Sequence, residues 1–343
     1  MNGRERIVSA LNLHEVDRTP VWFMRQAGRH LPEYRKIASE TSFWERCMDV
    51  DLCTKITCQP LERYPEIDAA IVFSDILTPL PSLGYEVKYG GGIKIDKFQF
   101  EDIDSWPKFN SRKDAPWAAN ALNALSDYTE DRVAHLGFVG SPWTIGMYLL
   151  AGGTGDKEFI ETRGKINSNP DQAKEMFDKL GTIVGNLLAD QVNYGGANAV
   201  QIFDTWAGLL DVDSYREYAM PGAKKALEVF RSEVNTKVPV IHYAKGSGHL
   251  HQAMMELDVQ CFSLDWRDDM QEYREKFGNK YAFQGNLDPS LLTSSVEKVS
   301  QETKNVMMRA GSSPGHIFNL GHGFSPSAKI DCVESILRTI KDE

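Results

Sequence analysis

The hydrophobic and polar positions of the chain form short apolar runs that alternate with longer stretches of helical spacing. Eight runs have the length and apolar content of buried strands: Val21–Met24, Ala69–Phe73, Val133–Val139, Ala197–Phe203, Val238–Tyr243, Val259–Leu264, Tyr281–Gln284 and His316–Asn319. Six stretches between or after them have helical patterns: Val50–Tyr64, Asp171–Tyr194, Asp213–Val229, Gly248–Leu257, Pro289–Ala310 and Ser327–Ile340. Strands that alternate with helices predict a parallel sheet, and about eight βα units predict a single (β/α)8 TIM barrel over residues 1–343.

Two stretches exceed what a barrel requires. Tyr85–Phe100 alternates in polarity around Gly90–Gly92, which predicts a β-hairpin inserted after the second strand. Glu101–Thr129 is a further insertion before the third strand. A doubly wound open sheet is the alternative fold, but no G-x-G-x-x-G motif follows a strand. Gly152–Gly155 lacks the Lys-Ser/Thr of a phosphate-binding loop and is expected to be a plain loop.

The first predicted strand runs into Met24–Arg35, with the sequence MRQAGRHLPEYR. Arg25 and Arg29 carry permanent charges whose planar guanidinium groups bind carboxylates bidentately. Gly28 between them lets the backbone turn or approach a ligand closely. The segment therefore suggests an anion-binding loop, although two solvated or ion-paired surface arginines would give the same pattern.

Polar residues follow every predicted strand. Because the carboxyl ends of barrel strands meet at one face, these residues are expected to converge there. The clusters are Arg25 and Arg29, Ser74-Asp75, Gly140–Trp143 with Tyr148, Asp204–Trp206, His242–Gly248, Asp265–Arg267, Gln284–Pro289 and Asn319–Gly323. Each cluster alone has a structural explanation as a helix cap, a turn or a buried polar group. Together, Arg25, Asp75, Tyr148, Thr205 and His322 suit a polycarboxylate ligand and proton transfer.

Net charge, the lengths of apolar runs and the lack of certain motifs argue against several classes of function. The 343 residues carry a net charge of −10, which argues against a nucleic-acid partner and against broad adhesion to membranes. The lack of a long apolar run, and an amphipathic charged N-terminus, lead us to expect a cytosolic protein. The five cysteines form no C-x-x-C pair, no H-E-x-x-H motif occurs, and no G-x-S-x-G elbow follows a predicted strand. Acid–base or electrostatic catalysis without a metal or cofactor is the chemistry that remains.

Seven motifs in order along nearly the whole chain closely resemble those of the uroporphyrinogen decarboxylase family: MRQAGRHLPEYR, FSDILTPLPSLG, GSPWT, VQIFDTWAG, LDWR, QGNLDP and FNLGHG. The resemblance implies a (β/α)8 barrel, usually a homodimer, that works without a metal or an organic cofactor. It implies removal of carbon dioxide from the four acetate side chains of uroporphyrinogen III, giving coproporphyrinogen III in haem biosynthesis.

The same resemblance implies roles for individual residues. The substrate-binding loop would be Arg25, Gln26, Ala27, Gly28 and Arg29. Asp75 matches a central carboxylate that faces the pyrrole NH groups. Tyr148, Thr205 and His322 match substrate-site positions, with threonine where the family often has serine. Catalytic roles would fall to Asp75, Arg29, Arg25, Tyr148 and His322, of which all but Asp75 are candidate proton donors. One departure is that Pro326 precedes Ser327-Ala328-Lys329 rather than an acidic residue, which affects only the start of the last helix.

Two other functions stay open at this point. A corrinoid or thiol methyltransferase on the same barrel would need a zinc-binding His-x-Cys pair near the fifth strand, where this chain has His242-Tyr243-Ala244. A non-catalytic tetrapyrrole carrier would need the arginines but not Asp75.

Overall fold

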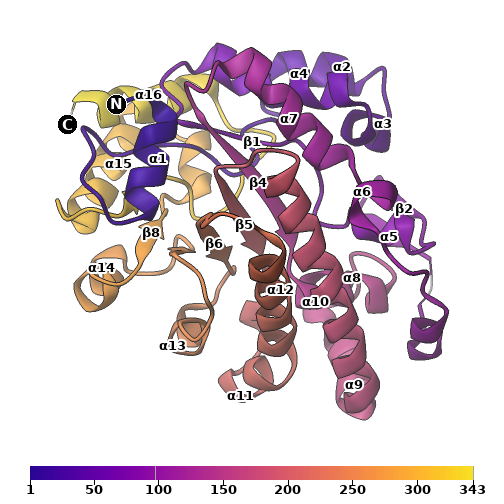
Figure 1. Ribbon diagram of the computed structural model, residues 1–343. Coiled ribbons are helices and arrows are strands. Elements are labelled where there is room, and N and C mark those ends of the chain that lie inside the picture. Colours follow the sequence, from indigo (N-terminus) through magenta and orange to yellow (C-terminus); the bar gives the residue numbers. More distant parts are fainter. Residues whose placement is uncertain (97, 343) are drawn as a thin grey trace.

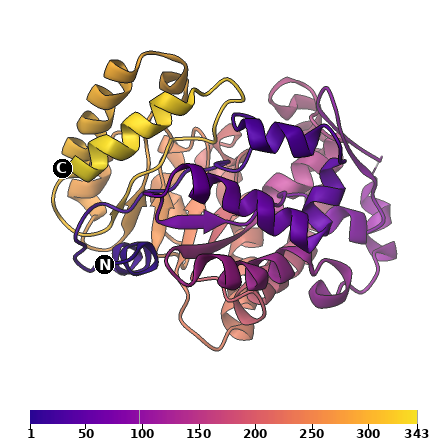
Figure 2. The ribbon, with the colours of Figure 1, turned by 90° about the horizontal axis from the view of Figure 1, so that it is seen from above.

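The computed structural model describes residues 1–96 and 98–342. Lys97, inside the predicted hairpin stretch, and Glu343, at the end of the predicted barrel, lie outside the described residues. A curled parallel sheet occupies the centre, and helices lie around it (Figures 1 and 2). The predicted α/β class with a parallel sheet is therefore confirmed.

The strands of this sheet follow chain order. In the described part of the chain they number seven: β1 (Ala69–Ile71), β4 (Ala134–Gly140), β5 (Ala199–Phe203), β6 (Val240–Tyr243), β7 (Cys261–Ser263), β8 (Ala282–Gln284) and β9 (His316–Ile317). Every neighbouring pair is parallel. Most strand residues are buried, which explains why the strands appear in the sequence as continuous apolar runs rather than alternating ones.

The segment around Val21 lies between the two outer strands of the sheet, β9 and β1. Val21 forms an isolated parallel bridge with Phe318. The backbone N–H of Phe318 donates to the carbonyl of Pro20 at 2.8 Å, and that of Asp68 donates to Val21 at 2.8 Å. Trp22 donates back to Phe318 at 3.3 Å. A few single hydrogen bonds thus connect the two outer strands.

The prediction of a strand at Val21–Met24 is wrong, and side chains are the reason. The backbone N–H of Phe23 donates to Oε1 of Gln26 at 3.0 Å, and that of Met24 donates to Oδ1 of Asn319 at 3.0 Å. These donors are therefore not available for a strand ladder. Val21 alone in this segment forms a bridge, although all four residues are buried as predicted.

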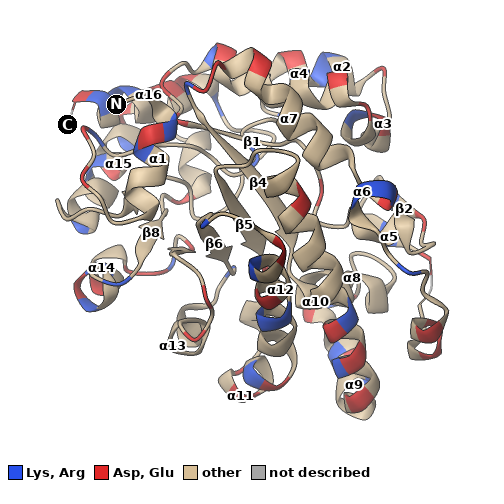
Figure 3. Ribbon diagram, in the orientation of Figure 1, with Lys and Arg blue, Asp and Glu red and all other residues tan. Residues whose placement is uncertain are grey.

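The observed helices agree with the predicted stretches most closely where the helix is long. The main ones that cover the sheet are α4 (Val50–Arg63), α8 (Pro142–Ala151), α10 (Pro170–Asn193), α12 (Met220–Glu233), α15 (Val296–Ala310) and α16 (Ile330–Asp342). Charges of both signs are interspersed on outer helices such as α9 (Ile160–Ser168) and α14 (Met270–Phe277) (Figure 3). No helix in the described ranges is long and apolar enough to cross a membrane.

Four predicted helices differ in extent from those observed. Gly248–Leu257 is helical over a shorter range, since a 3-10 turn (Gly248–Leu250) leads into α13 (His251–Met254) and hydrogen bonds of a turn end the helix there. Pro289–Ala310 is interrupted where the Ser295 side chain accepts from Lys298 N–H and caps α15.

Asp213–Val229 contains a π-helical turn at Tyr215–Ala219, just before Pro221, whose ring nitrogen cannot donate. The last helix begins at Ile330 rather than Ser327.

A two-stranded antiparallel sheet lies within the predicted hairpin stretch. It pairs β2 (Val87–Tyr89) with β3 (Ile93–Ile95), joined by three glycines that all have positive φ. The loop expected to be plain extends this sheet, because Thr154 N–H donates to Ile93 at 2.9 Å and Ile95 N–H donates to Gly152 at 3.0 Å. Gly153 permits this pairing, since a Cβ there would lie 2.0 Å from the carbonyl oxygen of Ile93.

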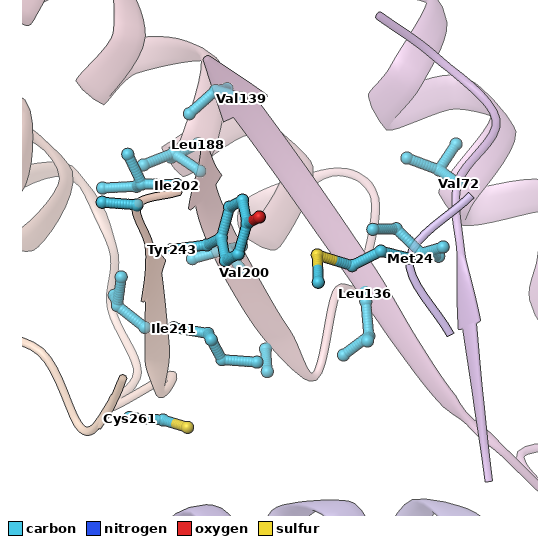
Figure 4. Packing of buried hydrophobic residues seen from close by; sticks show 14 of the residues in the cluster. Met24, Val72, Leu136, Val139, Leu188, Val200, Ile202, Ile241, Tyr243 and Cys261 are labelled. Atoms are coloured by element: carbon cyan, nitrogen blue, oxygen red, sulfur yellow. The ribbon is translucent and has the colours of Figure 1, made fainter. Parts of the chain in front are cut away.

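The core inside the sheet connects the segment Val21–Met24 to the central strands. Met24 points toward Leu136 of β4 and the β5–β6 pair, where Val200 and Tyr243 are buried (Figure 4). The side chain of Gln201 donates to the Met24 sulfur at 3.7 Å. This packing fixes the point at which the chain leaves the core and enters the loop that begins with Arg25.

Candidate active site

A cavity of about 690 Å³ opens at the carboxyl ends of β1, β4 and β5. Its volume falls within the range of about 300–1,000 Å³ typical of ligand pockets. Its walls are the loop 24–30, residues 71–76, the β2–β3 turn, and residues 322–326. Eight of the nine substrate-site residues that the resemblance implies line it: Arg25, Ala27, Gly28, Arg29, Asp75, Tyr148, Thr205 and His322.

Gln26 does not line the cavity. Its side chain is fully buried, accepts from Phe23 N–H, and donates to the carbonyl of Ala69 at 2.9 Å. It therefore holds the loop against β1. The polar clusters after the fifth, sixth and seventh predicted strands also lie away from the cavity wall, and there Asp265 accepts from Arg267 and from Gly246 N–H.

Asp75 is enclosed by protein but retains access to the cavity. Its Oδ1 accepts the backbone N–H of Leu77 at 2.8 Å, which fixes the carboxylate orientation and leaves Oδ2 for a ligand. Burial raises the pKa of Asp75, while the Leu77 N–H, the nearby Tyr89 and the Arg25 charge oppose that rise. The site thus holds a carboxylate whose negative charge is poorly compensated by its own surroundings.

Arg25 is held in an unusual backbone conformation at the entrance to the loop. Its φ is +60°, a left-handed value that is costly for a residue with a side chain and is common at functional sites. Its side chain crosses Gly323, where a Cβ would lie 2.5 Å from Arg25 Cδ. The glycine after His322 is therefore the reason Arg25 can extend over the cavity.

His322 has its tautomer determined by Tyr243. The Tyr243 hydroxyl lies 2.9 Å from both the Gly321 carbonyl and Nδ1 of His322. A carbonyl oxygen can only accept, so the single hydroxyl proton goes to Gly321 and His322 donates from Nδ1–H. Burial, together with the Arg25 charge, lowers the pKa of His322 to about 3. The ring is therefore neutral, with its Nε2 lone pair unprotonated.

Tyr148 and Thr205 complete the group of predicted residues. Tyr148 lies edge-on to the rings of Phe159 and Trp206, each with centroids 6.0 Å away. Burial raises the pKa of Tyr148, and the Asp75 charge raises it further, so the phenol keeps its proton. Thr205 is half-buried at the end of β5 and presents its side chain to the cavity.

Five further polar residues, outside the predicted strand-end clusters, line the cavity: His30, Tyr34, Arg46, Tyr89 and Ser325. Tyr89 comes from the β2–β3 sheet, and burial and the Asp75 charge both raise its pKa. Burial lowers the pKa of His30 to about 4. Arg46 comes from a short helix more than fifteen residues beyond the loop. His30 and Tyr34 belong to the Met24–Arg35 motif, whereas only the tertiary fold brings Arg46 and Tyr89 to the cavity, so no local motif could have identified those two.

The charge of the cavity wall is opposite in sign to that of the whole protein. Arg25, Arg29 and Arg46 line it, and Asp75 is the one acidic residue among the lining residues. Within residues 1–96 and 98–342, none of the three arginines forms a salt bridge. The same part of the chain contains no group of three or more His, Cys, Asp or Glu side chains arranged to hold a metal ion.

These features define a class: an α/β protein with an arginine-lined cavity at the carboxyl ends of parallel strands. Comparison with known proteins gives the family. The family model described as uroporphyrinogen decarboxylase (URO-D) matches residues 2–343. The chain therefore belongs to the uroporphyrinogen decarboxylase family.

Individual relatives agree with this assignment. A uroporphyrinogen decarboxylase from Saccharophagus degradans is 38% identical, covering 98% of this chain and 96% of the relative. Another from Alcanivorax borkumensis is 39% identical, covering 94% and 92%. Among solved structures, a methyltransferase from Methanosarcina mazei superposes with a TM-score of 0.83 at 17% identity, covering 100% of this chain and 99% of the other. That likeness concerns the fold alone.

Proposed function

We propose that the chain removes carbon dioxide from the four acetate side chains of uroporphyrinogen III to give coproporphyrinogen III. The observation that carries this proposal is a cavity with three arginines free of described salt bridges around one enclosed carboxylate, Asp75. A macrocycle with eight carboxylates and four pyrrole NH groups matches this arrangement, since the arginines can bind its carboxylates and Asp75 can accept from its NH groups. Family membership over nearly the whole chain supports the same substrate.

The arginines account for binding. Arg25 and Arg29 flank Gly28, and their side chains are exposed to the cavity. Each guanidinium can bind a carboxylate through two parallel hydrogen bonds. Ala27 and Gly28 keep the wall between them small, so the macrocycle can approach the loop backbone.

Asp75 accounts for the chemistry. Protonation of a pyrrole carbon gives a cationic ring with iminium character. The bond between the acetate methylene and its carboxylate then breaks, its electron pair neutralises the ring, and carbon dioxide leaves. The resulting exocyclic methylene takes a proton from solvent as the ring loses one, so each acetate becomes a methyl group. Oδ2 of Asp75 would accept the pyrrole N–H bonds and stabilise the cation by preorganised charge.

The retention of the propionates has a chemical reason. One additional methylene separates each carboxylate from the ring, so the electrons of its bond have no conjugated acceptor. Selectivity for acetates is therefore partly a property of the substrate, and the site has to provide only the protonated ring.

The protonation state of His322 removes it from the candidate proton donors. With its pKa lowered to about 3, His322 carries no additional proton at neutral pH. Its Nδ1–H is directed at Tyr243, so we assign His322 to accepting a substrate hydrogen bond at Nε2. Arg25, Arg29 and Tyr148 remain as the proton-carrying groups among the residues expected from the sequence.

The test is anaerobic incubation with freshly reduced uroporphyrinogen III, followed by oxidation and chromatography that counts carboxylates. A ladder from eight carboxylates down to four, unchanged by a metal chelator, is the expected result. Tight binding with all eight retained would indicate a carrier. No binding, with zinc present at stoichiometric level, would favour a methyltransferase.

We further propose that the sheet closes into a (β/α)8 barrel through the segment Pro20–Trp22, whose single hydrogen bonds join β9 to β1 although it forms no regular strand. We expect the protein to form a homodimer and to work in the cytoplasm. Sedimentation of the purified protein, where a monomer at micromolar concentration would contradict the dimer, tests the first of these two expectations.

A further inference from the structure

Arg46 is a buried cation of the cavity wall that none of the motifs includes. It lies in α3 (Phe43–Met48), is 7% exposed, and lines the cavity. Nothing in the sequence FWERCM marks it, because its position depends on how α3 packs against the loop that follows the arginine pair. Its surroundings therefore decide whether its role is structural.

The hydrogen bonds of Arg46 use only part of its donor capacity. Nη1 donates to the carbonyl of Thr41, at 3.2 Å to the Thr41 hydroxyl oxygen and, at 3.4 Å, to the carbonyl of Ala38. Nε is buried and has no hydrogen-bond partner. Nη2 donates to no carbonyl or carboxylate of the residues that the structure describes. An arginine offers five N–H donors, so part of this guanidinium is unused.

The position of the charge is fixed by two aromatic rings. The guanidinium carbon lies 5.6 Å from the ring centroid of Tyr34 and 5.8 Å from that of Phe43. Both rings also line the cavity. Burial raises the pKa of Tyr34, while the Arg46 charge and a hydrogen bond from its side chain to the phenol oxygen oppose that rise. Arg46 and the Tyr34 hydroxyl thus form a neighbouring pair of donors on one wall.

The other buried arginine of the described residues, Arg274, is satisfied by protein groups. Arg274, 9% exposed, donates to the carbonyls of Ala310, Ser313 and Pro314. Arg46 differs because it has neither a described acidic partner nor a full set of carbonyls. A buried, uncompensated charge is destabilising until an anion binds it. The structure thus contains a cationic position that a ligand carboxylate would complete.

We propose that Arg46, with the Tyr34 hydroxyl, binds one side-chain carboxylate of the substrate macrocycle, as a third cationic subsite beside Arg25 and Arg29. This inference rests on the proposed function. It predicts that Arg46 contributes mainly to substrate affinity, because it binds a carboxylate in the ground state and in the transition state alike.

Two variants test the subsite. Arg46→Gln removes the charge and is expected to raise KM about 10- to 100-fold with kcat nearly unchanged, the range for a hydrogen bond to a charged group. Arg46→Lys keeps the charge but loses the planar guanidinium, and is expected to raise KM several-fold. The melting temperature of the free protein should not fall much for either variant, because Nη1 bonds only Ala38 and Thr41 in one local turn, and Arg46→Gln also removes an uncompensated buried charge.

Arg274→Gln is the matched control, since it removes an arginine that has a structural role away from the cavity. It should lower the melting temperature and leave KM unchanged. If Arg46→Gln behaves in the same way, Arg46 is structural and the subsite is refuted. If Arg46→Gln does not fold, the lysine variant decides, and an unchanged KM there overturns the proposal.

The source of the carboxylate follows from the decarboxylation ladder. A bound propionate persists through every step, so the KM increase in Arg46→Gln would be equal for substrates with eight and with five carboxylates. A bound acetate disappears, so the increase would fade along the ladder. Either pattern supports the subsite. A wild-type protein that neither binds nor converts the macrocycle would instead overturn the proposed function itself.

Discussion

Replacing Asp75 by asparagine changes one atom of the site and removes its negative charge. The asparagine side chain can keep the Oδ1 acceptor for Leu77 N–H, now 2.8 Å away, so the local backbone should be retained. The atom that faces the substrate becomes an NH2 group. It would direct donors at the pyrrole N–H donors where an acceptor is needed, and it brings no charge to the cationic ring.

Two estimates give the size of the loss. A charge about 4 Å from the cation at an effective dielectric constant of about 20 contributes about 4 kcal/mol, or about a thousandfold in rate. Removing a preorganised group of this kind from an active site typically costs about 10²–10³ in kcat. We therefore expect kcat to fall by about 10²–10³ while the protein stays folded.

The same substitution should stabilise the free protein. Burial raises the folded pKa of Asp75 above its unfolded value, so the ionised form weakens the fold at neutral pH, and this cost fades as pH falls and the carboxyl is protonated. The neutral amide has no such cost. The melting temperature of the Asp75→Asn variant should exceed that of the wild type at pH 7, and the difference should shrink toward acid pH.

Asp68→Asn is the control, because Asp68 precedes the same strand at the opposite end. Its carboxylate binds Arg6, Arg18 and the N–H of Val21, so its replacement should lower stability and leave kcat unchanged. Anaerobic turnover of uroporphyrinogen III and thermal unfolding give both readouts. An Asp75→Asn variant with kcat within tenfold of the wild type would refute the role assigned to this carboxylate.

Three further predictions concern the same wall. Tyr243→Phe removes the acceptor for His322 Nδ1–H, and kcat should fall about two- to tenfold, the value of one neutral hydrogen bond, while ¹⁵N spectra show a mixture of His322 tautomers; an unchanged tautomer would contradict the assignment. Gly323→Ala puts a Cβ where the Arg25 side chain lies, so KM should rise with little loss of stability, and an unchanged KM would show that Arg25 does not contribute to binding. Because the pKa of Asp75 is raised, kcat/KM should decline with falling pH at a value above the usual aspartate pKa of about 3.9; a profile that is flat down to that pH would oppose it.

The sequence was most informative where local patterning and tertiary burial agree. The seven strands of the central sheet were all predicted, because parallel strands buried on both faces appear as short apolar runs. Val21–Met24 has the same apolar pattern, yet the side chains of Gln26 and Asn319 take its backbone donors. Such competition depends in part on a residue hundreds of positions away and leaves no local signal.

Some residues of the candidate site could likewise be predicted from the sequence, and others could not. Arg25, Asp75 and His322 follow apolar runs predicted as strands, so the rule for barrel strand ends indicates them. Arg46 and Tyr89 reach the cavity from a helix and a two-stranded sheet outside the βα units, where no periodicity indicates a direction. Gln26 is the opposite case, because it lies within the most distinctive motif but its side chain is buried in the core and does not line the cavity.

Decarboxylation in deuterium oxide tests the central claim most directly. Under anaerobic conditions with uroporphyrinogen III, each acetate should release one molecule of carbon dioxide and become a methyl group that carries one solvent deuteron. Four such methyl groups in the product, detected by proton NMR after oxidation and esterification, are the predicted result. Retention of all four acetates, or methyl groups formed without a solvent deuteron, would contradict the account.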